Sequence, residues 1–207
     1  MSTPPDVRPA RRAEIGSLAR TLAAAFQDDP VMEWLWPDPG RRASGLPRLF
    51  ATQTRHQHLA NGGVDIALDS SGAIGGVALW DAPGRWKPSV WRELRMLPQL
   101  ARAFGGRLRA GKELVELMTA VHPDEPHWYL ATIGTDPDRR GHGLGQALLQ
   151  SRLEQCDRDG IPSYLESSKQ ANIAYYERFG FEVTTKVTVP GGGPDLWLMW
   201  RTPRSRA

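Results

Sequence analysis

Residues 127–149 read HWYLATIGTDPDRRGHGLGQALL, and the interpretation of the whole chain begins here. Strand-forming and apolar residues occupy 128–133, and a turn follows at 134–138. A basic, glycine-rich loop covers 139–145, and leucines at helical spacing begin at Leu144. Such a strand–loop–helix junction can hold phosphate, because the first-turn N–H groups of a helix lack intrahelical partners and its dipole attracts anions.

Three kinds of phosphate loop are compared with this pattern, and spacing excludes two of them. A Walker A loop needs Lys followed by Ser or Thr after its glycines, and this dipeptide is absent from the loop. The dinucleotide fingerprint GxGxxG, counted from Gly141, would need its third glycine where Gln146 stands. What remains is Arg140-x-x-Gly143-x-Gly145, in which Arg140 offers forked donors for phosphate oxygens. The alternative is a glycine-rich turn that binds nothing.

Composition indicates one ordinary soluble domain. The chain has 207 residues, 40% hydrophobic and 24% charged, which suits a single domain with a sizeable core. No apolar run approaches the ~20 residues that span a bilayer, and residues 1–12 lack the apolar core of a signal peptide. We therefore expect a cytoplasmic protein without membrane contact. The single cysteine, Cys156, excludes an internal disulfide and is predicted to be a small core residue.

Charge and histidine placement limit the classes of partner. The net charge is +3, a modest excess that suits a small polyanionic ligand, and no nucleic-acid recognition motif is present. The five histidines are scattered, so no metal site is predicted. Residues 89–121 carry a basic face, interpreted as solvated or, alternatively, as a docking surface for an acidic partner. The sequence leaves monomer and homodimer open.

Periodicity predicts alternating strands and helices. The expected strands are 7–9, 64–68, 73–80, 128–133, 163–167, 181–189 and 196–201, and the expected helices are 11–26, 41–60, 89–121, from 144 onward, and 172–179. A further helical turn should begin near Pro30, and the region 89–121 should break near Pro98 and Gly105. This order predicts a mixed α/β sheet with helices on both faces.

Two motifs resemble those of the GCN5-related N-acetyltransferase (GNAT) family. The loop Arg140-x-x-Gly143-x-Gly145 is similar to its [QR]-x-x-G-x-[GA] pyrophosphate loop. Residues 172–181, NIAYYERFGF, are similar to its N-x-x-x-Y-E-x-x-G-F segment. Within the family the chain most resembles puromycin N-acetyltransferase-like proteins, for example at 165–168 and from Tyr176 through 194. The resemblance is weak from 31 to about 121, where such proteins build the acceptor pocket.

The resemblance implies a fold and a division of the chain. The expected GNAT fold has a central mixed, mostly antiparallel sheet of six to seven strands, splayed at the strand before the pyrophosphate loop, with helices on both faces. Residues 1–207 would form a single N-acetyltransferase domain, with the acceptor side in about 1–121 and the acetyl-CoA-binding half in about 127–207.

The resemblance also implies acetyl-CoA as co-substrate, without a metal. Backbone groups of the strand would hold the pantetheine arm and the thioester oxygen, and the loop would hold the pyrophosphate. The residues expected to contact acetyl-CoA are Ile133, Gly134, Thr135, Arg140, Gly141, His142, Gly143, Leu144, Gly145, Gln146, Asn172 and Tyr176. The alternative role of Asn172 is a helix N-cap, and the two roles are compatible.

Two residues are the expected catalysts. Tyr176 matches the family's general acid: a phenol with pKa near ~10 can protonate the departing thiolate. Its alternative role is packing or contact with the cofactor, and Tyr175 is expected to be the core residue of the two. Glu166, at the end of a strand, is the first choice for general base; its alternative role is a structural hydrogen bond at the splay.

The residues expected at the acceptor are Asp29, Trp34, Trp80 and Glu166. Helix capping explains Asp29 equally well, and each tryptophan taken separately is more often a core residue.

The resulting function is an N-acetyltransferase that acts by direct attack in a ternary complex. Its acceptor would be a primary amine of a small molecule, for instance an aminonucleoside antibiotic such as puromycin, which would connect the chain to antibiotic resistance. The alternatives are a non-catalytic acyl-CoA-binding or sensor module, a peptide or protein N-acetyltransferase and, more weakly, a nucleotide-dependent oxidoreductase.

Overall fold

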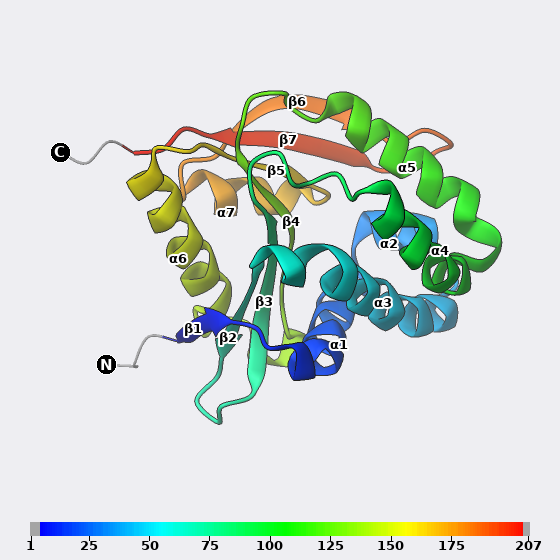
Figure 1. The fold of residues 1–207 in the computed structure, drawn as a ribbon, viewed down its shortest axis with the longest axis horizontal. Helices are drawn as coiled ribbons and strands as arrows, with labels where there is room; N and C mark the ends of the chain where they lie inside the picture. Colours follow the sequence, from blue (N-terminus) through cyan, green and yellow to red (C-terminus); the bar gives the residue numbers. More distant parts are fainter. Residues whose placement is uncertain (1–4, 205–207) are drawn as a thin grey trace.

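The fold is built on a seven-stranded sheet in the order β1-β2-β3-β4-β5-β7-β6 (Figure 1). The computed structural model describes residues 5–204, so the first residues of the N-terminal stretch considered above, 1–4, lie outside the described residues. The strands are β1 (Asp6–Pro9), β2 (Val64–Leu68), β3 (Ile74–Asp81), β4 (Trp128–Thr135), β5 (Ser163–Ser167), β6 (Glu182–Thr188) and β7 (Asp195–Arg201). Within the described chain, β4 and β5 are the one parallel pair. The predicted mixed, mostly antiparallel sheet is confirmed.

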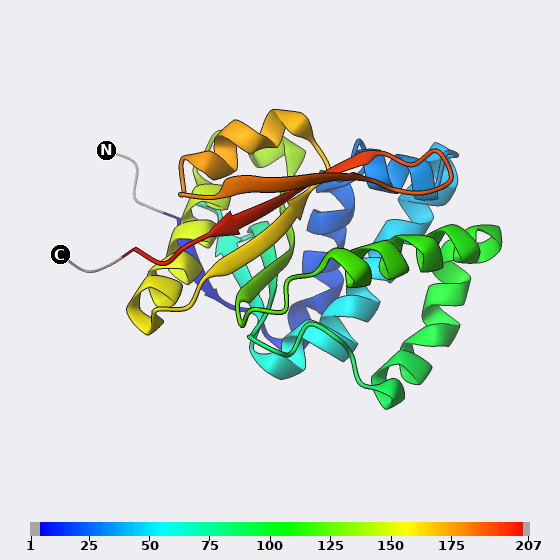
Figure 2. The same cartoon turned by 90° about the horizontal axis from the view of Figure 1, so that it is seen from above.

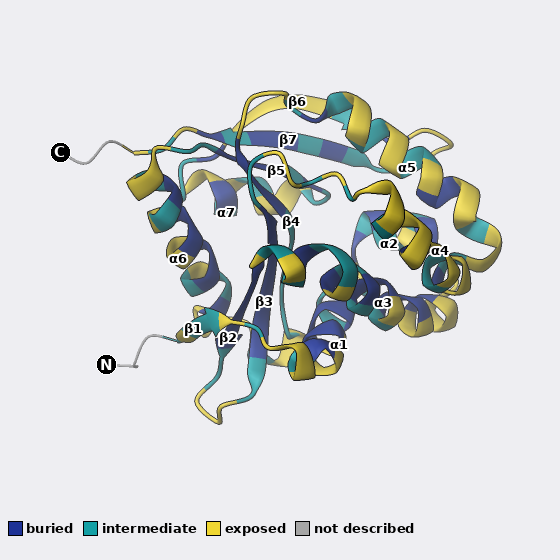
Figure 3. Ribbon diagram, in the orientation of Figure 1, coloured by how far each residue is buried: buried dark blue, intermediate teal, exposed yellow. Residues whose placement is uncertain are grey.

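Helices cover both faces of this sheet (Figures 1 and 2). They are α1 (Ile15–Ala25), α2 (Pro30–Leu35), α3 (Pro39–Gln53), α4 (Val90–Phe104), α5 (Leu108–Val121), α6 (Leu144–Asp159) and α7 (Ile173–Glu177). The helices α1 to α5 pack into a core on one face, and α6 and α7 pack into a second core on the other. The buried residues concentrate on the central strands of the sheet (Figure 3).

Strand alternation decides which side chains face which core. Tyr129 and Tyr164 lie opposite each other in the β4–β5 register and belong to the α1 side. Leu130 and Leu165, one residue further on each strand, belong to the α6 side. This is the period of two expected for pleated strands, and it places the two helical layers on opposite sides of one β4–β5 pair.

Glycine at 134 allows α1 to lie close against β4. A Cβ atom at this position would stand 2.8 Å from the Cβ of Ala25 and 3.2 Å from a methyl group of Leu22. No ordinary contact is that short, so any side chain here would push α1 away from the strand. Gly134 therefore has a packing role in addition to the cofactor contact that the sequence suggests.

The region 89–121 breaks at Gly105 and not at Pro98, so the predicted break at Pro98 is wrong. The helix α4 continues through Pro98 to Phe104, and Gly105 follows with φ 53°. Proline removes one helical hydrogen bond, here to the carbonyl of Leu94, and Leu94 is 51% exposed, so water can satisfy that group. On α5, Lys112 pairs with Glu116 on the same helix, as in an ordinary solvated face.

Two further features concern membranes and metals. Among residues 5–204, no helix combines the length and apolar character needed to cross a membrane. The same residues contain no group of three or more His, Cys, Asp or Glu side chains placed to hold a metal ion. Cys156 is fully buried in the core beneath α6, as predicted.

Candidate functional site

The site begins where β4 and β5 separate. The two strands pair at three positions, from Trp128↔Ser163 to Leu130↔Leu165, although β4 continues to Thr135. The separation coincides with a β-bulge: on β3, Leu79 faces Thr132 and Trp80 faces Leu130, so Ala131 is an extra residue. A bulge bends its strand and increases the local twist, which turns β4 away from β5. The predicted splay is thus present, and its cause is visible in the register.

A cavity of about 610 Å³ occupies this gap. It is lined by the C-terminal half of β4, the loop before α6, the end of β5 and α7. The predicted site residues that line it are Asp29, Ile133, Gly134, Thr135, Arg140, Gly141, Gly143, Leu144, Gly145, Gln146, Glu166, Asn172 and Tyr176. The structure brings these together from six separate elements and loops. Three predicted residues lie elsewhere: Trp34, Trp80 and His142.

The loop at the entrance of α6 has the backbone geometry that an anion needs. Gly141 and Gly143 have φ 84° and 75°, a left-handed conformation that favours glycine. Gly143 is the N-cap of α6, and the Ala147 N–H donates to its carbonyl at 2.9 Å. The three amides before Ala147 are therefore available to a ligand at the positive end of the helix dipole. A Cβ at Gly145 would stand 3.1 Å from the Tyr175 hydroxyl, so glycine keeps this cradle open.

The two arginines of the loop differ in their freedom. Arg139 is held by Asp69 at 2.7 Å and donates to the carbonyl of Ile74 at 3.1 Å, so its charge is already compensated. Arg140 makes no ion pair with a described residue and lines the cavity. The residues present thus fit a diphosphate: free amides, a helix dipole and one uncommitted guanidinium. His142 is exposed and does not line the cavity.

Glu166 stands at the inner end of the cavity with an unpartnered oxygen. It lies on the same face of β5 as Tyr164, whose ring is 5.8 Å from that of Tyr129 on β4. Burial raises the pKa of Glu166 to about 7, although the nearby phenols of Tyr129 and Tyr164 act in the opposite direction. Its Oε1 is buried and has no hydrogen-bond partner in the described chain. A carboxylate that is half ionised near neutral pH and open to a cavity can accept a proton.

Tyr176 also lines the cavity and is held in its protonated form. Burial raises its pKa well above the usual value, and the nearby Tyr175 and Asp29 act in the same direction. A phenol that stays protonated at neutral pH can donate a proton. The expectation that Tyr175 is the core residue of the pair is wrong: Tyr176 is only 8% exposed, Tyr175 is half-buried, and both line the cavity. On a helix as short as α7, consecutive residues can both reach the same hollow.

Asp29 has a structural role that accounts for most of its contacts. Its Oδ1 accepts hydrogen bonds from the amides of Val31 at 3.0 Å and Met32 at 3.1 Å, which caps α2. Its Oδ2 accepts a hydrogen bond from the Ser168 hydroxyl, which joins the α1–α2 connection to the end of β5. Burial raises the pKa of Asp29, opposed by the Ser168 hydrogen bond. This carboxylate still lines the cavity near Tyr176.

Of the remaining predicted residues, Asn172 lines the cavity, and Trp80 and Trp34 do not. Asn172 lines the cavity, and its side chain makes no capping hydrogen bond, so it is free for a ligand. Trp80 is 0% exposed and packs in the core beneath α6, because β3 is a central strand buried on both faces. It therefore does not line the cavity as expected of an acceptor residue. The Trp34 indole donates to the carbonyl of Gly191 at 3.4 Å and holds the β6–β7 hairpin.

Several polar residues that line the cavity were not predicted from the sequence, among them Ser168 and Lys169. Lys169 forms an ion pair with Asp28 at 2.9 Å. Together with the hydrogen bond from Ser168 to Asp29, this ion pair links the end of β5 to the α1–α2 connection. A signal was present, because a Ser-Lys dipeptide directly follows the predicted strand 163–167, at the edge where site residues gather.

Two buried histidines lie beneath the tyrosines that flank Glu166. The His127 Nδ1–H donates to the Glu125 carbonyl at 2.6 Å, so its Nε2 is the acceptor for the His122 Nε2–H at 3.1 Å. His122 also stacks on Trp86 with 3.7 Å between ring centroids. Burial, then the charge of His127 and that of Lys87, lowers the pKa of His122 to about 4; burial lowers that of His127 as well.

This pair predicts a loss of stability in mild acid. The pKa of His122 is about 4 in the folded chain against 6.5 for a free histidine, so folding favours its neutral form. The stabilisation is present above pH 6.5 and is lost as the pH falls towards 4. We expect urea unfolding to show a steeper decline between pH 7.5 and 5 in the wild type than in His122→Asn. The exposed His142→Gln is the control, and equal slopes in all three proteins would contradict this role.

Comparisons with known proteins agree with this geometry. The sequence profile of the acetyltransferase (GNAT) family matches residues 29–181. An uncharacterised N-acetyltransferase of Schizosaccharomyces pombe is 29% identical over 91% of this chain and 80% of its own length. A mycothiol acetyltransferase of Propionibacterium freudenreichii is 28% identical over 86% of this chain and 65% of its own length.

A solved structure is similar along the full length. The Corynebacterium glutamicum protein described as histone acetyltransferase HPA2 and related acetyltransferase has a TM-score of 0.78 and 30% identity, and the match covers 99% of both chains. The matched family profile includes the splayed strand, the loop before α6 and α7. The chain belongs to the acetyltransferase (GNAT) family and is an acyltransferase.

Proposed function

We propose that the protein transfers the acetyl group of acetyl-CoA to a primary amine of a small molecule, by direct attack in a ternary complex. One observation carries this proposal: the glycine-rich loop before α6, Glu166 and Tyr176 line a single cavity. Near neutral pH the carboxyl group of Glu166 can be ionised and accept a proton, and the phenol of Tyr176 is protonated and can donate one. A non-catalytic acyl-CoA-binding module would have no need for an ionisable carboxyl group and a protonated phenol in the wall of the same cavity.

Acetyl-CoA supplies an activated acetyl thioester. The amides of residues 144–146 and the Arg140 guanidinium would hold its diphosphate, and Asn172 would contact it from α7. On the side facing β5, backbone groups of Ile133 to Thr135 are unpaired with that strand and line the cavity. Backbone N–H groups aimed at the developing oxyanion would lower the barrier, typically by about 3–4 kcal/mol for each donor.

Glu166 and Tyr176 divide the proton transfers between them. A neutral amine forms the new N–C bond, and ionised Glu166 accepts the proton that the nitrogen must lose. The C–S bond breaks, and the Tyr176 hydroxyl donates its proton to the departing sulfur. The proton on Glu166 then returns to the phenolate through the solvent, which restores both residues.

The acceptor end favours a compact amine over an extended peptide. The Trp34 indole of α2 donates to Gly191 at the tip of the β6–β7 hairpin, and a Cβ at Gly191 would lie 3.6 Å from the Glu113 carboxylate of α5. This hairpin therefore bridges two helices on the acceptor side, as Figure 2 shows. Aminonucleosides such as puromycin are the first acceptors to test, given the resemblance of residues 165–168 and 176–194; acetylation of such a compound would confer antibiotic resistance.

A peptide or protein amine is the second candidate, favoured by one observation. The Corynebacterium glutamicum structure, 30% identical along the full length, is described as a histone acetyltransferase and related acetyltransferase. Peptide N-termini and lysine-containing peptides therefore belong in the same acceptor panel.

The test is thiol release from acetyl-CoA by the purified protein. The panel contains aminonucleosides, aminoglycosides, polyamines and peptides, with acetyl-CoA alone as the blank. We expect at least one small amine to raise the thiol release at least tenfold above the blank. Saturable CoA binding without any acceptor-dependent release would instead support the sensor module, and absence of CoA binding would refute the assignment of the loop.

A further inference from the structure

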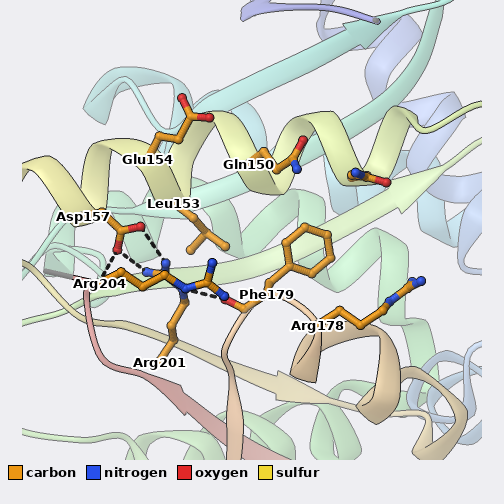
Figure 4. A pocket seen from close by; sticks show the side chains of 9 residues that line it. Gln150, Leu153, Glu154, Asp157, Arg178, Phe179, Arg201 and Arg204 are labelled. Atoms are coloured by element: carbon orange, nitrogen blue, oxygen red, sulfur yellow. Dashed lines mark hydrogen bonds and ion pairs between the residues drawn. The ribbon is translucent and has the colours of Figure 1, made fainter. Parts of the chain in front are cut away.

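A second hollow, of about 320 Å³, lies beside α6, outside the catalytic cavity (Figure 4). It is formed by α6, the residues that follow α7 and the end of β7. Gln146, in the first turn of α6, lines both this hollow and the catalytic cavity, so the two adjoin at the phosphate loop. A ligand whose diphosphate sits on the loop could therefore extend directly into this second hollow.

One ion pair in the hollow is structural. The Arg201 guanidinium, on β7, donates to both carboxylate oxygens of Asp157 at 2.7 Å and to the Phe179 carbonyl at 2.8 Å (Figure 4). The Asp157 carboxylate also accepts from the backbone N–H of Arg204 at 2.8 Å. The Arg201 side chain is only 2% exposed, so its charge is fully used in fixing β7 to α6.

Two further guanidiniums of the hollow are uncommitted. Arg178 and Arg204 line it, and neither side chain makes an ion pair with a residue in the part of the chain that the structure describes. The Arg178 guanidinium lies 5.0 Å from the ring centroid of Tyr175, which itself lines the catalytic cavity. Glu154 is the one acidic side chain of the hollow outside the Arg201 pair, so two cations face one anion.

This charge pattern matches a part of coenzyme A that the catalytic cavity does not account for. Besides its diphosphate, coenzyme A carries a 3′-phosphate on the ribose of its adenosine. A phosphate is bound well by a forked guanidinium at short range. The half-buried Phe179 ring, beside Arg178, offers a surface on which an adenine can stack.

We propose that Arg178 binds the 3′-phosphate of coenzyme A in this second hollow, at the end that adjoins Tyr175. The inference rests on the proposed function, because it assumes that the diphosphate occupies the loop before α6. It assigns to this chain a recognition site that distinguishes coenzyme A from its 3′-dephospho form.

The experiment combines a change in the protein, the loss of one arginine, with a change in the ligand, the loss of the 3′-phosphate. Dissociation constants of coenzyme A and of 3′-dephospho-coenzyme A are measured by calorimetry for the wild type, Arg178→Gln, Arg140→Gln and Arg158→Gln. We expect the wild type to bind coenzyme A about tenfold more tightly than the dephospho form, as for one charge-assisted contact. In Arg178→Gln the affinity for coenzyme A should fall about tenfold, with the affinity for the dephospho form unchanged within twofold. Arg178→Gln should therefore bind the two ligands with nearly equal affinity.

The controls separate this site from the loop and from general charge effects. Arg140→Gln should weaken both ligands by the same factor, because the diphosphate is common to them. Arg158 is exposed on α6 and lines neither hollow, so Arg158→Gln should leave both affinities unchanged. Equal loss of both ligands in Arg178→Gln, or a wild type that does not discriminate, would overturn the inference while leaving the proposed function intact. If neither ligand binds the wild type, the proposed function fails and this site with it.

Discussion

Replacing Glu166 by Gln is expected to lower kcat/KM for the acceptor about 100-fold at pH 8, the usual scale for loss of a general base. The amide keeps the shape of the carboxyl group, but it cannot accept the proton of the attacking amine. Because the pKa of Glu166 is raised to about 7, the wild-type kcat/KM should rise as the pH increases through 7 and the carboxylate ionises. In Glu166→Gln the part of this rise that is due to the carboxylate should be lost, so that the remaining pH dependence follows the deprotonation of the acceptor amine alone, and the affinity for coenzyme A should be unchanged.

The control for this variant is Glu182→Gln, which changes an exposed carboxylate of β6. It should retain the wild-type rate and pH profile. Thermal unfolding of both variants shows whether the fold is intact. If Glu166→Gln keeps more than half of the activity, or keeps the wild-type pH profile unchanged, then Glu166 has only a structural role at the splay.

Replacing Tyr176 by Phe is expected to lower kcat more than tenfold, which corresponds to about 1.4 kcal/mol or more of transition-state stabilisation. The variant removes the hydroxyl that we propose as the proton donor to the departing sulfur, and it leaves the buried ring in position. The raised pKa of Tyr176 means that its phenol is protonated throughout the assay range, so the loss should be similar at each pH. Calorimetry should give a dissociation constant for coenzyme A within threefold of the wild-type value.

The neighbouring Tyr175→Phe is the matched control, because Tyr175 also lines the cavity with its hydroxyl next to Gly145. We expect it to keep at least a third of the wild-type kcat. A Tyr176→Phe protein with an unchanged kcat would remove Tyr176 as the acid. Equal losses in the two variants would indicate that both hydroxyls only orient the co-substrate.

The sequence alone determined the family, the order of the elements and the place of the glycine-rich loop before α6. These features depend on short-range requirements: glycine where φ is positive at 141 and 143, leucines at helical spacing after Leu144, and a run of strand-forming residues at 128–133. Each can be recognised within a few neighbouring residues. Arg140 and Asn172 were found in the same way, through motifs whose spacing is local.

Only the tertiary structure decided the protonation of the two proposed catalytic residues, Glu166 and Tyr176. The raised pKa values of Glu166 and Tyr176 result from burial by segments distant in sequence. Trp80 lies in the core for the same reason, because β3 occupies a central position in the sheet. The deeper burial of Tyr176 compared with Tyr175 has the same origin. Protonation and exposure depend on which strands pair and which helices cover them, and such long-range contacts leave little trace in any short stretch of the chain.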